Sequence, residues 1–444
     1  MSLVTRSPRS RPDVRSRQPR PTEDDTAARV LAPLLHAVFG ERTPVRFAFW
    51  DGSDTGASPV DGVVRVHSPL AVRRILWAPD QLGLARAYVA GELDIDGDVY
   101  AMLTALRDAV PTDMRLGWQV APAALTAARR LGVLGPPPPP PDEERRLHGW
   151  RHSVRRDSRA ISHHYDVGND FYRLVLGPAM TYSCAYFASP DLDLAGAQAA
   201  KHELICRKLG LHERAGMRLL DVGCGWGSLA IHAAREHGAQ VVGITLSREQ
   251  VHLARQRLAD AEVSDRVEIR LQDYRDLHDE TFDAIASVGM SEHVGGGRIS
   301  RYFRILRDLL VPEGRLLNHA ISSVDGSRLG RRSFVGRYVF PDGELLDVGD
   351  TVLAMEHAGL EVRDVEALRE HYATTLRCWV ANLEAAWDEA VALAGPGRAR
   401  VWRLYMAGSA IGFADAGLSV HQVLGVRTTV EGRSGVPPTR AGWT

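Results

Sequence analysis

The segment that most constrains the fold of this chain is a short apolar run that ends in three closely spaced glycines, Leu219–Gly227 with the sequence LLDVGCGWG. In an α/β unit, glycines at this position let the backbone approach a ligand and turn into the next helix, whose N-terminal amides face that ligand. The following helix is predicted over Ser228–His237. The pattern indicates a nucleoside cofactor, although the glycines alone leave a purely structural turn open.

The same segment argues against a nicotinamide or flavin dinucleotide. Its spacing is G-x-G-x-G, whereas dinucleotide folds use G-x-G-x-x-G. The next apolar run, Gln240–Thr245, also ends without the acidic residue that would hold a ribose. A nicotinamide-dependent oxidoreductase therefore becomes the less favoured alternative.

Strand-like and helical segments alternate through the second half of the chain. This alternation predicts a doubly wound α/β sheet of parallel strands, with ligands at the carboxyl ends of those strands. The expected strands are Arg218–Asp221, Gln240–Thr245, Val267–Leu271, Phe282–Ser287 and Arg315–Ile321, and the expected helices include Arg248–Ala261 and Ser300–Leu310.

Four regions of different composition predict the domain organisation. Residues 1–25 are rich in Arg, Ser and Pro and predict a disordered basic tail. Residues 26–135 predict a small N-terminal α+β domain, residues 136–150 a linker that opens with six consecutive prolines, and residues 151–444 the larger domain that carries the glycine turn. The expected N-terminal elements are strands at Val45–Trp50 and Gly62–Val66 and helices at Leu70–Leu76 and Leu82–Ala90.

Charge and cysteine content narrow the class of protein. The formal net charge of -1 argues against a nucleic acid partner. The sequence lacks an apolar run long enough to span a bilayer, and no apolar stretch follows the arginine-rich N-terminus. We therefore expect a cytoplasmic protein. Its four cysteines form no CxxC pair, so neither a disulfide framework nor a metal site is predicted: Cys184, Cys206, Cys224 and Cys378.

Four further motifs accompany the glycine turn. They are HHYDVGNDFY at residues 163–172, MTYSCAYF at 180–187, GMSEHVG at 289–295 and HYATTLR at 371–377. Together the five motifs resemble the cyclopropane fatty acid synthase family, which includes mycolic acid cyclopropane synthases and actinobacterial methyltransferases that make mid-chain branched lipids. The resemblance covers residues 155–427 and, more weakly, the segment Leu82–Leu93.

The resemblance implies a Rossmann-like methyltransferase sheet and S-adenosylmethionine as the cofactor. It also implies an antiparallel hairpin at the end of the sheet, formed by Leu360–Leu368 and Ser419–Arg427. We assign the helical stretch Tyr372–Ala416, together with Ser327–Tyr338, to a cap over the acyl site.

The resemblance assigns the cofactor contacts by position. Tyr182 and Ser183 are expected at the methionine end, Thr245 and Gln250 near the ribose, and Asp273 with Tyr274 at the adenine, while the glycine turn contributes Asp221, Gly223, Gly225 and Gly227. Two alternatives remain open: Ser247 is also a plausible helix N-cap, and Asp273 is also compatible with a surface turn.

Members of the resembled family add a methyl group to an isolated alkene and use a bound bicarbonate to remove a proton from the resulting carbocation. The residues implied for the bicarbonate site are Cys184, Glu292, His319, the backbone N–H of Ile321, and Tyr372. Aromatic faces can stabilise such a cation, which would suit the rings of Tyr165, Phe171, Tyr172, Tyr182, Tyr186 and Phe187. For any single one of these rings, a place in the core is the favoured alternative.

The expected substrate is the unsaturated acyl chain of a phospholipid. An arginine cluster is compatible with peripheral contact with anionic headgroups on the inner face of the membrane: Arg328, Arg331, Arg332 and Arg337. A solvated basic face is left open as the alternative. Ser291 stands where many relatives carry an aromatic or larger apolar residue, so we expect it to trim the pocket volume or to add a hydroxyl near the cation. This favours a methylene-branched product, reducible by a separate reductase, over a cyclopropane. A homo-oligomer, a small-molecule O- or N-methyltransferase and a non-catalytic lipid-binding relative are left open.

Overall fold

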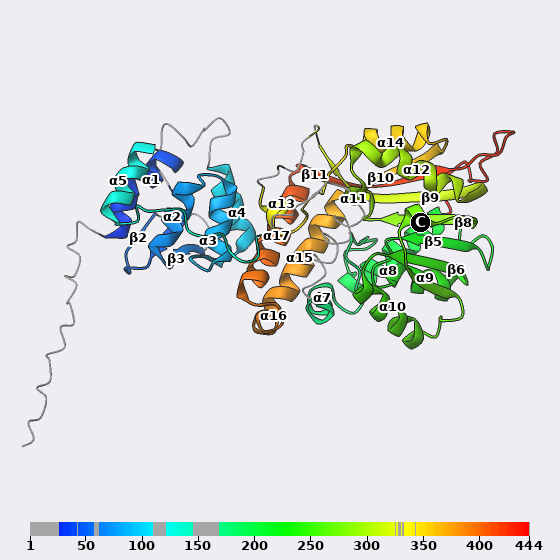
Figure 1. The fold of residues 1–444 in the computed structure, drawn as a ribbon, viewed down its shortest axis with the longest axis horizontal. Helices are drawn as coiled ribbons and strands as arrows, with labels where there is room; N and C mark the ends of the chain where they lie inside the picture. The colour runs from blue at the N-terminus through cyan, green and yellow to red at the C-terminus, as the bar shows by residue number, and fades with distance from the viewer. Residues whose placement is uncertain are drawn as a thin grey trace, which may run out of the picture.

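The computed structural model describes residues 26–41, 43–56, 62–109, 121–144, 168–324, 326, 330, 333–341 and 343–443. The described part of the chain is elongated, with the N-terminal elements and a large sheet at opposite ends and the helices α15, α16 and α17 between them (Figure 1). The predicted basic tail and the HHYDV part of the first family motif lie outside the described residues.

The N-terminal elements form a four-stranded sheet with helices. Its order is β2-β1-β3-β4, in which β1 and β3 are parallel and the other neighbours are antiparallel. Two helices begin as their sequences predict: Ser68 accepts from the Leu70 N–H and is followed by a proline, and Asp80 accepts from the N–H groups of Leu82 and Gly83. The bounds are α1 Ala27–Phe39, β1 Arg46–Phe49, β2 Asp54–Thr55, β3 Gly62–Val66, α2 Pro69–Trp77, α3 Gln81–Val89, β4 Leu93–Gly97, α4 Val99–Asp108 and α5 Ala121–Arg130.

The large sheet has seven strands in the order β10-β11-β9-β8-β5-β6-β7. Strands β9, β8, β5, β6 and β7 are parallel. Strand β11 pairs antiparallel with β9 and with β10, which lies at the edge of the sheet. The predicted methyltransferase sheet is therefore confirmed. The bounds are β5 Arg218–Val222, β6 Gln240–Thr245, β7 Val267–Leu271, β8 Phe282–Val288, β9 Leu310–Ser323, β10 Glu361–Ala367 and β11 Leu418–Val426.

Helices cover both faces of this sheet because its central strands are apolar on both sides. On β5, Leu219 packs into the core beneath α8, α9 and α10, whereas its neighbour Leu220 packs into the core beneath α12 and α14. Successive side chains of a strand point to opposite faces, so one apolar run serves both cores. The helix bounds are α7 Asn169–Leu176, α8 Leu194–Lys208, α9 Ser228–His237, α10 Arg248–Asp260, α11 Ser291–Val294, α12 Ile299–Asp308 and α14 Val348–His357, with short 3-10 turns η2 Tyr274–Asp276 and η3 Gly296–Arg298.

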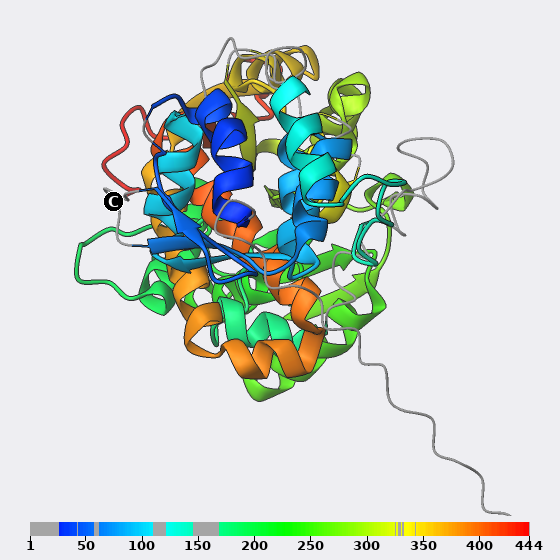
Figure 2. The same ribbon diagram turned by 90° about the vertical axis from the view of Figure 1, so that its left-hand side faces the viewer.

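The expected cap is helical. It contains α15 Arg369–Ala385, α16 Trp387–Ala394 and α17 Pro396–Ala414, together with the short helix α13 Phe334–Tyr338. Residues 327–329, 331 and 332 of the expected cap lie outside the described residues. Viewed along the long axis, the N-terminal elements lie in front of these cap helices (Figure 2).

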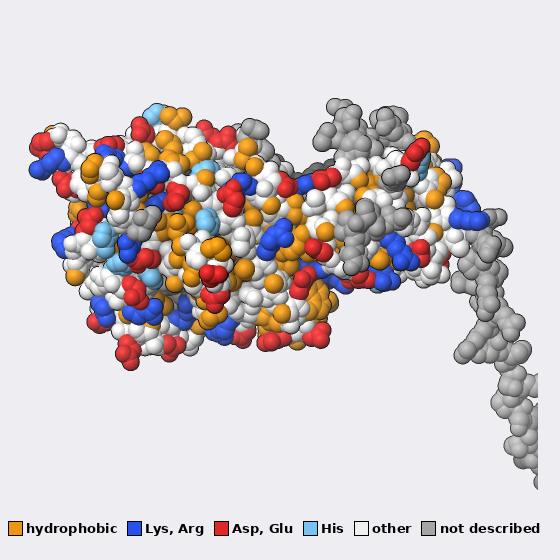
Figure 3. Space-filling view, turned by 180° about the vertical axis from the view of Figure 1, so that it is seen from behind, with side chains coloured by type: hydrophobic (Ala, Val, Ile, Leu, Met, Phe, Trp, Pro, Cys, Tyr) orange, Lys and Arg blue, Asp and Glu red, His pale blue; other side chains and the backbone are white. Residues whose placement is uncertain are grey.

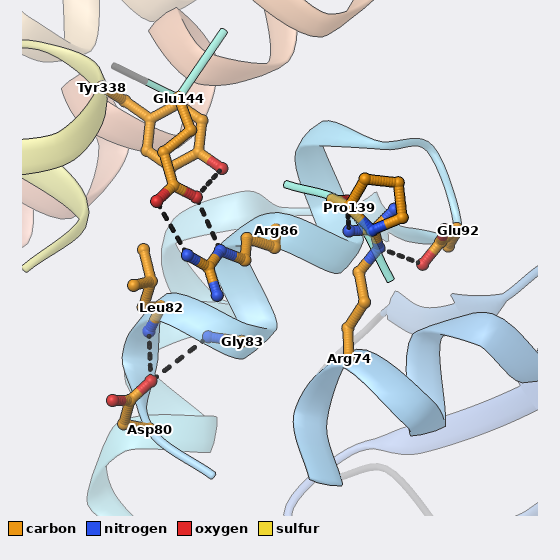
Figure 4. Close-up of polar contacts among 9 residues, drawn as sticks. All are labelled: Arg74, Asp80, Leu82, Gly83, Arg86, Glu92, Pro139, Glu144 and Tyr338. Atoms are coloured by element: carbon orange, nitrogen blue, oxygen red, sulfur yellow. Dashed lines mark hydrogen bonds and ion pairs between the residues drawn. The ribbon is translucent and has the colours of Figure 1, made fainter. Parts of the chain in front are cut away.

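Polar contacts join the N-terminal elements to the cap and to the linker. On α17, Arg400 pairs with Asp94 at 2.6 Å, and Arg403 donates to the Tyr88 hydroxyl at 3.1 Å. The linker residue Glu144 accepts two bonds from Arg86, at 2.6 and 2.7 Å, and a third from the Tyr338 hydroxyl of α13 at 3.4 Å (Figure 4). The linker therefore ties α3 to α13 instead of acting as a loose spacer. The division into domains itself stays a prediction.

Charges on the molecular surface are mixed. On the face shown in Figure 3, acidic and basic side chains are interspersed and neither sign forms a continuous field. This matches the formal net charge of -1. Among the described residues, no helix has the length and apolar character needed to cross a bilayer.

Candidate active site

A cavity of about 200 Å³ opens at the carboxyl ends of the parallel strands, where the fold predicts a ligand. Its walls come from the ends of β5, β6, β8 and β9, from the segment before α8, from α8 itself and from the cap. Of the fifteen residues predicted for the site, fourteen line this cavity: Tyr182, Ser183, Cys184, Asp221, Gly223, Gly225, Thr245, Gln250, Asp273, Tyr274, Glu292, His319, Ile321 and Tyr372.

The glycine turn forms one wall. Gly225 has a φ of +55°, and a Cβ atom built on it would meet nothing within 4 Å, so the backbone here borders open space. Gly227 is the exception among the predicted residues, because it does not line the cavity. It begins α9 with a φ of +78°, and a Cβ atom there would contact Ala254 at 3.5 Å, so its role in the structure is the turn into the helix.

A buried acid and a buried amine flank the turn. Asp221, the penultimate residue of β5, has a buried Oδ2 atom with no hydrogen-bond partner among the described residues, and burial raises its pKa to about 7. Lys201 of α8 is 1% exposed, donates to the Ser183 hydroxyl at 2.9 Å, and has its pKa lowered to about 8 by burial. The pair offers complementary charges to a zwitterionic ligand.

The far end of the cavity holds the residues expected near the ribose and the adenine. The Thr245 hydroxyl donates to Gln250 Oε1 at 2.6 Å, and Ser247 caps α10 by accepting from the Gln250 N–H. The N-cap interpretation of Ser247 is thus confirmed. Asp273 precedes η2 and pairs with Arg275 at 2.6 Å, and at 6% exposure it is a buried turn residue and not a surface one.

Two orphaned polar atoms mark the inner part of the cavity. Glu292 Oε1 accepts from the Ile321 N–H at 2.9 Å, whereas Oε2 is buried without a partner among the described residues. Burial raises the pKa of Glu292 to about 7. His319 Nδ1 lies 3.3 Å from the Gln422 amide, and Nε2 is likewise buried and unpaired. Burial lowers the pKa of His319 to about 3, so the ring is neutral, and acceptance at Nδ1 leaves its proton on Nε2.

Cys184 and Tyr372 complete this inner region. Burial raises the pKa of the Cys184 thiol, which stays protonated and donates to the Ala185 carbonyl at 3.1 Å. The Tyr372 ring packs against Phe413, with centroids 4.6 Å apart. Buried, unsatisfied donors and acceptors are costly in a folded protein, so Glu292 and His319 indicate that this region receives a polar ligand.

Two expectations about neighbouring residues need correction. Ser291 does not line the cavity; it is 5% exposed, and its hydroxyl accepts from Asn318 at 3.5 Å. It therefore cannot trim the pocket directly. Among the aromatic residues expected around a cation, Tyr182 lines the cavity and Tyr165 lies outside the described residues, whereas the other four are elsewhere: Phe171, Tyr172, Tyr186 and Phe187.

The structure adds cavity residues that sequence reasoning missed. Trp226 lies inside the glycine motif, so the sequence already contained a signal for it. In the structure its ring packs on the Tyr172 ring, with the two centroids 4.9 Å apart. Lys201 and His202 fall in the middle of a helix without any motif, and Phe340 follows a short helix of the cap. The additional lining residues include Lys201, His202, Trp226, Met290, His293 and Phe340.

Comparisons with known proteins agree with this architecture. Residues 152–423 match the family described as mycolic acid cyclopropane synthetase. A probable fatty acid methyltransferase of Mycobacterium tuberculosis is 41% identical over 89% of this chain and 93% of its own length. The cyclopropane-fatty-acyl-phospholipid synthase of Escherichia coli is 35% identical over 75% of this chain and 79% of its own.

A solved structure shows the same fold. The mycolic acid cyclopropane synthase CmaA1, in complex with SAH (S-adenosylhomocysteine) and CTAB, is 34% identical and superposes with a TM-score of 0.57 over 60% of this chain and 97% of its own. The family match covers well over half of the chain. This protein belongs to the cyclopropane fatty acid synthase family of methyltransferases.

Proposed function

We propose that this chain transfers a methyl group from S-adenosylmethionine to the double bond of an unsaturated acyl chain carried by a phospholipid. The observation that carries the proposal is the pair of orphaned atoms, Glu292 Oε2 and His319 Nε2, in a cavity that also has aromatic walls. The acceptor atom of an O- or N-methyltransferase already carries a lone pair, so its reaction forms no carbocation that aromatic walls would have to stabilise.

The residues at the glycine turn fit the cofactor. The open backbone at Gly225 allows close approach, and the buried Asp221 and Lys201 complement an ammonium and a carboxylate. When bound, S-adenosylmethionine supplies an electrophilic methyl group on a sulfonium. The chain's part is to align the alkene with that methyl and to exclude water, because an isolated alkene is a weak nucleophile.

The inner region fits a small oxyanion such as bicarbonate. With its proton on Nε2, His319 can donate to an anion, and Glu292, whose pKa is raised to about 7, can either donate or accept near neutral pH. Tyr372 adds an O–H group to the same cavity, and Cys184 lines it with a thiol that donates to the Ala185 carbonyl. Bicarbonate held there would supply a base for the proton that the alkyl cation must lose.

Aromatic faces are placed to stabilise the cation until that proton leaves. Tyr182, Trp226, Phe340 and Tyr372 all line the cavity, and a ring face attracts a cation without trapping it covalently. These rings replace most of the aromatic set that the sequence suggested. Their role applies equally to a methylene-branched and to a cyclopropane product.

For the product we propose a methylene-branched chain that a separate reductase could convert to a methyl branch. The support is the 41% identity to a relative named as a fatty acid methyltransferase, against 35% to one named as a cyclopropane synthase. Peripheral contact with the membrane is also proposed, although only Arg337 of the predicted arginine cluster belongs to the described residues.

The decisive experiment incubates the purified chain with vesicles of dioleoyl phosphatidylglycerol and S-adenosylmethionine labelled with ¹³C in its methyl group. We expect the label in the lipid acyl chain, seen as vinylidene signals by NMR. Signals of ring protons at high field would instead identify a cyclopropane and overturn the proposed product. Unlabelled lipid, combined with methylation of added soluble amines or alcohols, would overturn the proposed substrate.

A further inference from the structure

Outside the cavity, α8 and α9 bring together four side chains that commonly bind metal ions. Glu203 and Cys206 lie one turn apart on α8, and His232 and His237 lie near the end of α9, which packs beside α8 on the same face of the sheet. The Sγ atom of Cys206 and one ring nitrogen from each histidine all lie within 4.8 Å of one another.

The spacing of these atoms already approaches that of a coordination sphere. Glu203 Oε2 lies 3.1 Å from His232 Nε2 and 2.9 Å from His237 Nε2. In a tetrahedral zinc site with bonds of about 2.0–2.1 Å, neighbouring nitrogen and oxygen ligands are roughly 3.3 Å apart. Both imidazoles therefore direct Nε2 toward the same carboxylate oxygen. Glu203 is not among the residues whose ligand atoms all lie within 4.8 Å of one another, so its carboxylate reaches the histidines but not the Cys206 thiol.

The surroundings of the cluster hold the carboxylate in place. Arg207 donates through Nε to the other oxygen of Glu203, Oε1, at 2.7 Å. This contact fixes the orientation of the carboxylate and leaves Oε2 for the histidines, as outer residues do around known metal sites. Burial decreases along the cluster, from Cys206 with no exposure to the Glu203 side chain at 32%, which leaves a route of entry from solvent.

Charge and donor type favour zinc over other common cations. A thiolate and two imidazoles are ligands that zinc prefers, and the carboxylate held against both histidines supplies a second negative charge near a divalent ion. The hydrogen bonds of Glu203 with the two histidines and Arg207 would by themselves explain the position of its carboxylate. They would not account for Cys206, whose thiol makes no hydrogen bond within the described part of the chain.

We propose that Cys206, His232 and His237 bind one Zn²⁺ ion that fastens α8 to α9, with the Glu203 carboxylate held against the two histidines. The site is separate from the methyl transfer chemistry, but it supports one wall of the cavity. Helix α8 carries the lining residues Lys201 and His202, and the His202 ring lies 5.7 Å from the His232 ring. Sequence reasoning missed this site, because its ligands come from two helices, one before and one after β5 along the chain, and form no short motif.

The test uses the full chain without a histidine tag, stripped with a chelator and titrated with ZnCl₂ by calorimetry. We expect one ion bound per chain and a rise in melting temperature with zinc, because a ligand that binds the folded state stabilises it. Co²⁺ in place of zinc should give the absorption of a tetrahedral site with a thiolate-to-metal band. That band should be absent in Cys206→Ser.

Two substitutions and one control separate this site from adventitious binding. Cys206→Ser and His237→Gln should each weaken zinc binding by at least about tenfold. His252→Gln, at an exposed position of α10, should bind zinc like the wild type. Substoichiometric binding, or binding that both cluster variants leave unchanged, would overturn the proposal. If circular dichroism shows that Cys206→Ser does not fold, the zinc affinity of His237→Gln decides whether the proposal stands.

Discussion

At the scale of single residues, Glu292 shows how one environment can serve both binding and proton transfer. Its Oε1 atom is held by the Ile321 N–H, and its Oε2 atom is left for a ligand. A carboxyl group whose pKa is raised to about 7 can take up or release a proton near neutral pH at little cost.

We predict that Glu292→Gln lowers the rate of methyl transfer by about 10²–10⁴-fold, the usual contribution of a group engaged in acid or base catalysis. The affinity for S-adenosylmethionine should stay within a factor of about two, because the residue lies in the inner region and not at the glycine turn. Turnover with labelled lipid and binding by calorimetry measure the two effects. Glu389→Gln, on the exposed side of α16, is the control. Turnover at the wild-type rate would remove Glu292 from the mechanism.

The same substitution should change how stability depends on pH. In the folded chain Glu292 keeps its proton up to about pH 7, whereas in the unfolded chain it loses the proton near pH 4.5. Between these values the unfolded state binds fewer protons, so the free energy of unfolding falls as pH rises, by at most about 1.4 kcal/mol per pH unit. Glu292→Gln should remove this contribution. Urea unfolding of both proteins at pH 5 and pH 7 checks it, and identical pH dependences would contradict the raised pKa.

The role of the glycine turn, which forms one wall of the cavity, can be tested at Gly225. We predict that Gly225→Val abolishes detectable binding of S-adenosylmethionine, because the side chain would project into open space that the ligand needs, from a backbone with positive φ. Calorimetry measures the affinity. Gly408→Val, at an exposed position of α17 where a Cβ atom also meets nothing within 4 Å, should bind normally. Unchanged affinity in the Gly225 variant would make the turn purely structural.

At the scale of helices and strands, the sequence predicted the elements whose periodicity is strong. Strands β6 and β7 match the expected ranges, and α10 ends one residue earlier than expected. The short strands β2 and β4 were missed, because β2 has two residues and β4, with the sequence LDIDG, carries aspartates that are uncommon in strands. Strand β9 begins earlier than expected, at Leu310 instead of Arg315, since pairing with its neighbours extends it beyond its most apolar part.

The site was predictable to the extent that its residues fall in motifs or at strand ends. Lys201 could not be found, because a lysine inside a helix is ordinarily a solvated residue, and only packing of α8 on the sheet buries it beside Ser183. Ser291 was misjudged for the opposite reason. Its place in a motif suggested the cavity, whereas the turn of α11 directs it toward Asn318.

The linker contact between α3 and α13 should contribute measurably to stability. The Glu144 side chain is 1% exposed and pairs with Arg86 through two bonds. Removing one partner of such a pair leaves a buried charge, so Arg86→Gln should lower the free energy of unfolding by about 3–5 kcal/mol. Arg46→Gln, which breaks the exposed pair with Asp54, should cost less than about 1 kcal/mol. Urea unfolding of both variants provides the comparison, and equal losses would contradict the assigned role of Glu144.

At the scale of the whole molecule, the N-terminal elements and the cap share one apolar core. It includes Met102 of α4 and Trp402 of α17, far apart in the sequence. The ion pair of Arg400 and the bonds of Arg403 cross the same boundary. The N-terminal elements and the cap are thus coupled through α17. We therefore expect a change in the cap to alter the local stability of the N-terminal sheet.

We predict that Arg403→Ala speeds amide hydrogen exchange in α3 and β4 although the substitution lies on α17. Its guanidinium donates to the Tyr88 hydroxyl at 3.1 Å and to the Ile95 carbonyl at 3.3 Å, and its loss leaves both groups unsatisfied. Exchange in β5 and β6 should stay unchanged and serves as the internal reference. Mass spectrometry resolves these peptides. Faster exchange confined to α17 would show that the N-terminal elements and the cap are energetically independent.

The position of Trp226 gives the molecule a built-in optical reporter. The indole lines the cavity beside the glycine turn, donates from Nε1 to Asn169 at 2.9 Å, and packs against the Tyr172 ring. An indole that gains a nucleoside as a neighbour changes its emission, so titration with the cofactor should alter the intrinsic fluorescence without any added dye. Among the nine tryptophans of the chain, replacement of this one by phenylalanine should silence the signal.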